Sequence, residues 1–163
     1  MLEYKSIVTE GDTTVLPIDE GFKLAVFAFV DSDEQFQSGA TFFRFLAQAL
    51  ENDCDFGFVD ENITIPEIDS IAENVGKVDV VILAFFYQRY DSVHTGTNKE
   101  KLSGIAARLS AGLKTVSVFF GNAMMKHNIK SNLTICTKSL SESSIAAVTL
   151  VLSGRTPTVE KFT

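Results

Sequence analysis

The chain has 163 residues, 45% of them hydrophobic, and a formal net charge of −7 at pH 7. This length and apolar content predict one folded domain with a sizeable core and exclude an intrinsically disordered chain. We expect neither nucleic acid nor a membrane as partner, because phosphate neutralisation needs clustered lysines and arginines, and no apolar run approaches the roughly 20 residues that span a bilayer.

Residues 1–21 predict a lead-in arm rather than a core element. A mixed stretch, Tyr4–Thr9, is followed by a polar turn at Glu10–Asp12 and then by Val15–Ile18. Residues 1–10 also lack the apolar stretch of a signal peptide. We expect a periplasmic or secreted location if a longer parent protein carries a signal peptide, and a cytoplasmic location otherwise.

Apolar runs then predict strands that are covered on both faces of a sheet. The longest run is Val78–Phe86, and Leu24–Val30 and Val116–Phe120 have the same character. A strand with one wet face alternates apolar and polar residues, so runs without alternation indicate central strands of a parallel sheet. Shorter strands are expected at Phe56–Val59 and Leu133–Cys136.

Helical patterns alternate with these strands. Four Ser or Thr residues, each followed three residues later by Glu or Gln, mark expected helix starts: Ser32 with Gln35, Thr64 with Glu67, Thr97 with Glu100, and Ser139 with Glu142. The inner face of the first helix is expected to carry Phe36, Ala40, Phe43, Ala47 and Leu50. Glycines at 76, 112 and 154 are expected to end the later helices.

Strict alternation of five strands with about five helices predicts an α/β fold. We expect a three-layer sandwich: a five-stranded, mainly parallel, flavodoxin-like sheet with helices on both faces. Counting strands from residue 22, the expected order is 2-1-3-4-5. Residues 22–154 form the sandwich domain, preceded by the arm of residues 1–21 and followed by a tail of residues 155–163.

The longest polar connection, Tyr87–Thr97, is the best candidate site by position. It leaves the carboxyl end of the central strand, the edge where open α/β sheets bind ligands. Arg89, Tyr90, Asp91 and His94 could bond sugar hydroxyls or the backbone of a partner. The alternative is an ordinary solvated loop.

Several familiar chemistries are disfavoured. The turn after the first strand, Asp31–Glu34, carries three carboxylates and no glycine, which would repel a nucleotide or flavin phosphate. Its acids could flank a sugar as a catalytic pair, but they serve equally well at the positive end of a helix. His94 and His127 are isolated, so no metal site and no cofactor are expected.

The two cysteines, Cys54 and Cys136, fall in predicted strands that are far apart in sequence. Free cysteine behaves as a small hydrophobic side chain and is often buried. We therefore expect two core thiols rather than a disulfide or a pair of metal ligands.

Several short motifs along the chain, each weak alone, form an ordered set. They include Lys23–Val26, which matches a K-I-A-V strand, Asp79–Leu83, which matches D-V-V-I-V, Val116–Asn122, which matches V-V-L-V-x-F-G-N/S-P, and Ser144–Gly154, which matches I-A-A-x-x-L-F-G. Taken in order, they resemble the C-terminal α/β-sandwich domain of glycoside hydrolase family 3. Phe36-Gln37, followed by Phe45-Leu46, is similar to a helix of the β-N-acetylhexosaminidase branch.

The resemblance implies an accessory role. In this family the nucleophilic aspartate lies in a TIM-barrel domain, which this chain lacks. The β-glucosidase branch places its acid/base glutamate just after the central strand, where this chain has Phe85 and Phe86. The hexosaminidase branch carries its acid/base histidine in the barrel. The resemblance therefore implies no catalytic residue here, a TIM-barrel partner domain, and N-acetylglucosamine-containing glycans as possible ligands of the parent.

The sequence is consistent with three functions. The first is an accessory domain that packs on a catalytic barrel, with the 87–97 loop lining its substrate entrance, as the matching loop does in the family. The second is a free-standing flavodoxin-like module that binds a small ligand or a protein. The third is a small enzyme that uses the same loop. The coding sequence upstream of Met1 would separate the first from the other two.

Overall fold

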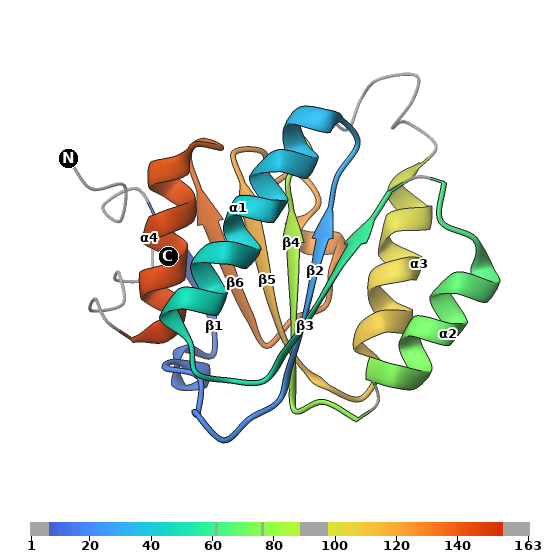
Figure 1. The fold of residues 1–163 in the computed structure, drawn as a ribbon. Coiled ribbons are helices and arrows are strands. Elements are labelled where there is room, and N and C mark those ends of the chain that lie inside the picture. Colours follow the sequence, from blue (N-terminus) through green and yellow to red (C-terminus); the bar gives the residue numbers. More distant parts are fainter. Residues whose placement is uncertain (1–6, 61, 76, 89–97, 155–163) are drawn as a thin grey trace.

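The computed structural model describes residues 7–60, 62–75, 77–88 and 98–154 (Figure 1). Its strands are β1 (Val8–Gly11), β2 (Leu24–Phe29), β3 (Cys54–Val59), β4 (Val80–Phe85), β5 (Lys114–Phe120) and β6 (Leu133–Thr137). Its α-helices are α1 (Asp33–Ala49), α2 (Ile65–Val75), α3 (Asn98–Ser110) and α4 (Glu142–Ser153). Two short 3-10 helices, η2 (Thr13–Val15) and η3 (Lys126–Asn128), complete these elements.

The strands form one six-stranded sheet in the order β1-β6-β5-β4-β2-β3. Five strands are parallel, and β1 runs antiparallel to β6. The central strand β4 lies between β2 and β5, with Leu83 opposite Phe27 on one side and Ser117 on the other. The expected α/β class is confirmed, but the expected strand number and the order of the complete sheet are wrong, because β1 adds an edge strand.

The expected lead-in arm thus contributes to the sheet. Val8 pairs with Cys136 and Gly11 with Leu133. Ile7, just before the strand, is fully buried in the core. A four-residue strand is too short to show the alternation by which strands are recognised in a sequence, so only its pairing with β6 reveals it.

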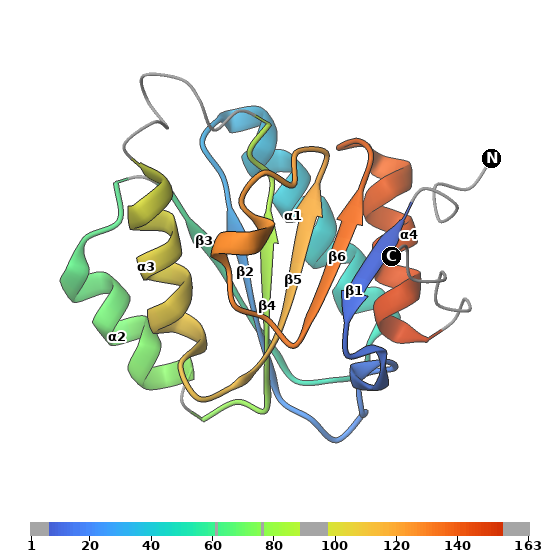
Figure 2. The same cartoon turned by 180° about the vertical axis from the view of Figure 1, so that it is seen from behind.

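Helices cover both faces of the sheet, which gives three layers (Figures 1 and 2). On one face, Phe42 and Leu46 of α1 and Val148 of α4 share a core with the strands. On the opposite face, Ile68 of α2 and Ile105 of α3 pack in a second core. About five helices were expected. Among the described residues, the connection from β5 to β6 holds only the 3-10 helix η3, so four α-helices are present.

The helix α1 is rotated relative to the expected face. Phe43 and Leu50 are buried as expected, but Phe36 is 48% exposed, and Ala40 and Ala47 are exposed. The buried side of the helix is instead formed by Gln35, Gly39, Phe42, Phe43 and Leu46. Apolar residues lie on more than one side of α1, so packing against the sheet decides which side is buried. The buried faces of α3 and α4 do keep helical spacing, with Leu102, Ile105, Ala106 and Leu109 in α3 and Ile145, Val148 and Leu152 in α4.

Helix caps follow the sequence signals at three of the described ends. The Ser32 hydroxyl accepts a hydrogen bond from Gln35 N, and Thr64 Oγ1 accepts one from Glu67 N. Gly154 ends α4 in the left-handed conformation. The expected start at Ser139 is wrong, because Ser141 caps α4 in a capping box with Ser144. Within the described part of the chain, no helix has the length and apolar character needed to cross a membrane.

Candidate functional site

The candidate loop lies largely outside the described residues. Arg89, Tyr90, Asp91 and His94 all fall in the range 89–97, so their role as substrate-entrance residues stays a prediction. The structure does describe Tyr87 and Gln88, which follow the end of β4 where the loop departs. The carboxyl ends of β5, β2 and β3 lie at the same edge of the sheet.

Two amides tie the ends of β4 and β5 together. Gln88 Nε2 donates hydrogen bonds to the carbonyl oxygens of Phe86, at 2.9 Å, and Phe120, at 2.7 Å. Asn122 Nδ2 donates to the carbonyl oxygen of Gln88 at 3.0 Å. A glycine is needed at 121, because its φ is +89° and a Cβ would lie 2.5 Å from Gln88 Oε1. The described end of the β4 segment, at Gln88, is therefore tied to the end of the neighbouring strand β5.

Sequence reasoning did not single out Gln88 or Asn122. The available signal was weak: an amide side chain follows each of two buried strands by two or three residues. Because neighbouring parallel strands end at the same edge, such residues can meet there. Their mutual bonding depends on the strand order, which the tertiary structure supplies.

Acidic side chains gather where β2 and β3 end. A pocket of about 200 Å³ is lined by Asp31, Asp33, Asp60, Asn62 and Phe36, among others. Carboxylates accept hydrogen bonds and disfavour a phosphate nearby, because like charges repel. One of these acids stabilises its own turn: Asp60 Oδ1 accepts a hydrogen bond from Asn62 N at 2.9 Å.

Phe85 and Phe86 stand where the β-glucosidase branch was expected to carry its acid/base glutamate. Both side chains are fully buried, Phe85 in the core under α2 and α3 and Phe86 in the core under α1 and α4. Neither position faces solvent or a pocket edge. A carboxylate at either would be desolvated in an apolar core rather than presented to a substrate.

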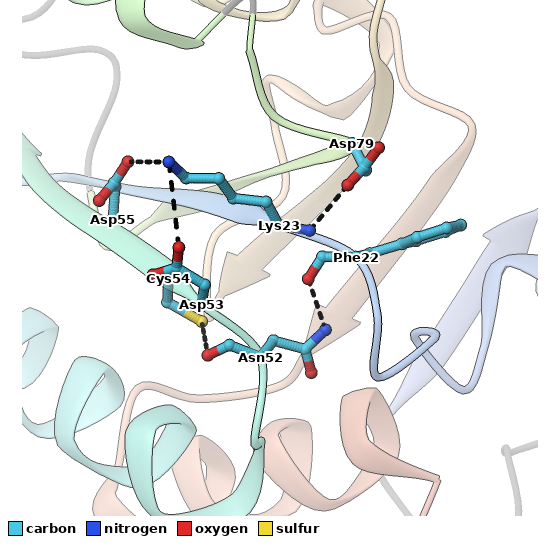
Figure 3. Close-up of polar contacts among 7 residues, drawn as sticks. All are labelled: Phe22, Lys23, Asn52, Asp53, Cys54, Asp55 and Asp79. Carbon is cyan, nitrogen blue, oxygen red and sulfur yellow. Dashed lines mark hydrogen bonds and ion pairs between the residues drawn. The ribbon is translucent and has the colours of Figure 1, made fainter.

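The opposite, amino edge of the sheet carries a polar network that ties three strand starts together (Figure 3). Lys23 N donates to Asp79 Oδ2 at 2.8 Å, and Asp79 N donates to Lys23 O at 2.8 Å. Lys23 Nζ lies 3.8 Å from Asp55 and 4.0 Å from Asp53. Asn52 Nδ2 donates to Phe22 O at 2.8 Å. These contacts hold the starts of β2, β3 and β4 together.

The two thiols are free and half-buried. Burial raises the pKa of Cys54 to about 11, with Asp53 and Asp55 adding to the effect. Burial also raises the pKa of Cys136 to about 11, although Lys126 opposes the shift. Both thiols pack against a core but are only half-buried, so the expectation of core thiols holds in part. Thiols with a raised pKa are poor nucleophiles at neutral pH.

Within the described ranges, no three His, Cys, Asp or Glu side chains are grouped so as to hold a metal ion.

No protein-family model matches the chain, and no curated protein sequence matches it. Solved structures do match. A glycoside hydrolase family 3 β-N-acetylglucosaminidase from Paenibacillus sp. str. FPU-7 has a TM-score of 0.68 at 17% identity, over 94% of this chain and 29% of that enzyme. A β-glucosidase from Listeria innocua has a TM-score of 0.67 at 15% identity, over 94% of this chain and 24% of that enzyme. The β-glucoside phosphorylase BglX has a TM-score of 0.63 at 16% identity, over 96% of this chain and 29% of that enzyme.

These matches show that the chain has the fold of one segment of three larger carbohydrate-active enzymes. The resemblance to glycoside hydrolase family 3 is confirmed at the level of the fold. At this identity the likeness concerns architecture and not activity. The chain spans between 24% and 29% of the length of the three enzymes.

Proposed function

We propose that this chain is an accessory domain of a glycoside hydrolase, which packs on a TIM-barrel catalytic domain and lines its substrate entrance. One observation carries the proposal: almost the whole chain matches less than a third of the Paenibacillus enzyme. The remaining length of such an enzyme is ample for a barrel of about 250 residues.

Within that class, a parent of the β-N-acetylhexosaminidase type is favoured. Its reaction would be hydrolysis of a terminal N-acetylglucosamine with retention, through a covalent glycosyl intermediate. The support is the buried phenylalanine pair at Phe85 and Phe86, which stands where the β-glucosidase branch is expected to carry its acid/base glutamate. In the hexosaminidase branch, by resemblance, both catalytic groups lie in the barrel. N-acetylglucosamine-containing glycans are then the expected ligands of the assembled protein.

The coding sequence upstream of Met1 is the first test. A reading frame of about 250 or more residues with a barrel pattern supports the accessory role. A stop codon directly upstream would contradict it and would favour the free-standing binding module.

The second test concerns the entrance loop in the assembled enzyme. Arg89→Ala and Tyr90→Ala are expected to raise KM for an aryl N-acetylglucosaminide severalfold while leaving the melting temperature of the domain nearly unchanged. His127→Ala, an exposed substitution on η3, is the matched control and should leave KM unchanged. If both loop variants unfold the domain, or if the kinetics stay as in the wild type, the loop is only a connection.

A further inference from the structure

The outer edge of β3 is an open strand edge. Among the described residues, β3 pairs only with β2. Leu24 N donates to Asp53 O, and Val30 N donates to Val59 O, so the odd-numbered residues of β3 turn their backbone groups inward. In a ladder these groups alternate, so the N–H and C=O groups of Cys54, Phe56 and Phe58 point away from the sheet. The edge therefore offers donors and acceptors to a further strand.

A partly exposed aromatic cluster lies beside this edge. Phe36 of α1 stacks on Phe58 with ring centroids 4.0 Å apart, and Phe43 stacks on Phe56 at 4.7 Å. Phe36 is 48% exposed and Phe56 is 38% exposed. Side chains alternate along a strand, so Phe56 and Phe58 share the face that α1 covers. An added strand would place every second side chain against this cluster.

The other face of the edge is acidic. Asp55 lies between the two phenylalanine-facing positions and points to the opposite face. It is exposed, as is Asp53, which lies two residues before it on the same face. Lys23 lies within 4.0 Å of both carboxylates, so the two acids and this lysine together carry a net negative charge. The remaining side chains of an added strand would therefore meet negative charge.

We propose that the β3 edge binds an extended peptide segment in which apolar and basic residues alternate, as a seventh strand. Main-chain hydrogen bonds to Cys54, Phe56 and Phe58 supply affinity, as in other cases of strand addition. Apolar side chains of the peptide cover Phe36 and Phe56, and its basic side chains face Asp55. A second copy of the chain fits less well, because each copy carries a net charge of −7.

This surface is independent of the proposed accessory role. The β3 edge and the β1 edge are the two opposite edges of the sheet (Figure 1). The candidate entrance loop leaves the end of β4 rather than β3. Peptide binding could therefore fail while the accessory role holds, and the reverse is also true.

The test uses the full chain and a fluorescein-labelled peptide, Lys-Phe-Lys-Val-Lys-Phe, measured by fluorescence anisotropy. A peptide of the same composition with its three lysines placed first, Lys-Lys-Lys-Phe-Val-Phe, controls for charge alone. We expect the alternating peptide to bind at least about fivefold more tightly than this control. Its binding should also weaken as salt is raised, because the acidic groups are exposed.

Two variants locate the site. Phe56→Ser should weaken binding of the alternating peptide at least about fivefold. Ile65→Ser, a substitution at an apolar residue of α2 that is 61% exposed, is the matched control and should bind as the wild type does. Amide exchange gives a second readout that does not need a variant: the amides of Phe56 and Phe58 should exchange more slowly when the peptide is bound.

The proposal is overturned if the two peptides bind equally, or if Phe56→Ser binds as tightly as the wild type. It is also overturned if the amides of Phe56 and Phe58 are slowed only by raising the protein concentration. That last result would assign the edge to self-association, which analytical ultracentrifugation would show as a concentration-dependent mass.

Discussion

At the scale of single residues, the environment of each thiol determines its chemistry. Cys54 begins β3 next to Asp53 and Asp55, and Cys136 lies in β6 opposite Val8 of β1. Burial raises the pKa of both thiols to about 11 from an ordinary value of 9.0. Both groups therefore hold their proton more tightly in the folded chain than in the unfolded chain.

This difference predicts a loss of stability at alkaline pH. A group whose folded pKa is raised stabilises the fold fully below its unfolded pKa, and this contribution is lost as the pH rises through the folded pKa. The window is thus about pH 9 to 11. Urea melts at pH 8 and pH 10 measure the free energy of unfolding. Between these two pH values it should fall more for the wild type than for the Cys54→Ala, Cys136→Ala double variant. Equal losses would show that the thiols are solvated as in the unfolded chain.

At the scale of elements, α1 approaches the sheet closely at one glycine. A Cβ on Gly39 would lie 2.9 Å from Phe58 Cε1 and 3.1 Å from Ala28 Cβ. Both are shorter than ordinary contacts between packed side chains. The helix α3 provides a contrast, because a Cβ on Gly104 would meet nothing within 4 Å.

The two glycines are expected to respond to alanine with opposite signs. Gly39→Ala gains helix propensity but overpacks the interface, so we expect a net loss of about 1 kcal/mol in the free energy of unfolding. Gly104→Ala gains propensity alone and should stabilise by up to about 1 kcal/mol. Urea melts of both variants provide the measurement. A higher free energy of unfolding in both variants would mean that Phe58 moves aside at little cost.

Packing makes the β1 segment part of the folded domain. Ile7 is fully buried, whereas its neighbour Val8 is half-buried. Ile7→Ala should therefore destabilise by about 2–4 kcal/mol, because it removes buried methyl groups and leaves a cavity. Val8→Ala is the control and should cost about 1 kcal/mol or less. If Ile7→Ala costs no more than the control, residues 7–11 act as a detachable arm after all.

At the scale of the whole molecule, the chain has a complete three-layer core, but its described part offers no evident catalytic centre. The end of β4 carries two buried phenylalanines, and the described acids at the carboxyl edge serve partly as local hydrogen-bond acceptors. The accessory role proposed above would explain this character, because the partner domain would then supply the reacting groups.

We therefore predict that the isolated chain does not hydrolyse an aryl N-acetylglucosaminide. The release of the aryl group should equal that of a heat-inactivated sample at the same protein concentration. Turnover above this background that is abolished by one substitution in the chain, such as Asp31→Asn, would contradict the prediction and make the chain an enzyme in its own right.

Local patterns in the sequence determined the parallel core of this protein. The unbroken apolar run of β4 predicts a strand buried on both faces, and all six of its residues are buried. The apolar face of α3 and the caps at Ser32 and Thr64 also follow from spacing, because their partners lie within one or two helical turns.

Pairing between segments that are far apart in the sequence decided the remaining features of the fold. The strand β1 is recognisable only through its pairing with β6, which lies more than 100 residues away. The side of α1 that is buried depends on where Phe58 and Ala28 lie. The hydrogen bond between Asn122 and Gln88 depends on β4 and β5 being neighbours. The open edge of β3 exists because no described strand follows it in the sheet. Sequence spacing determines contacts within an element, whereas contacts between elements depend on which distant segments the folded chain brings together.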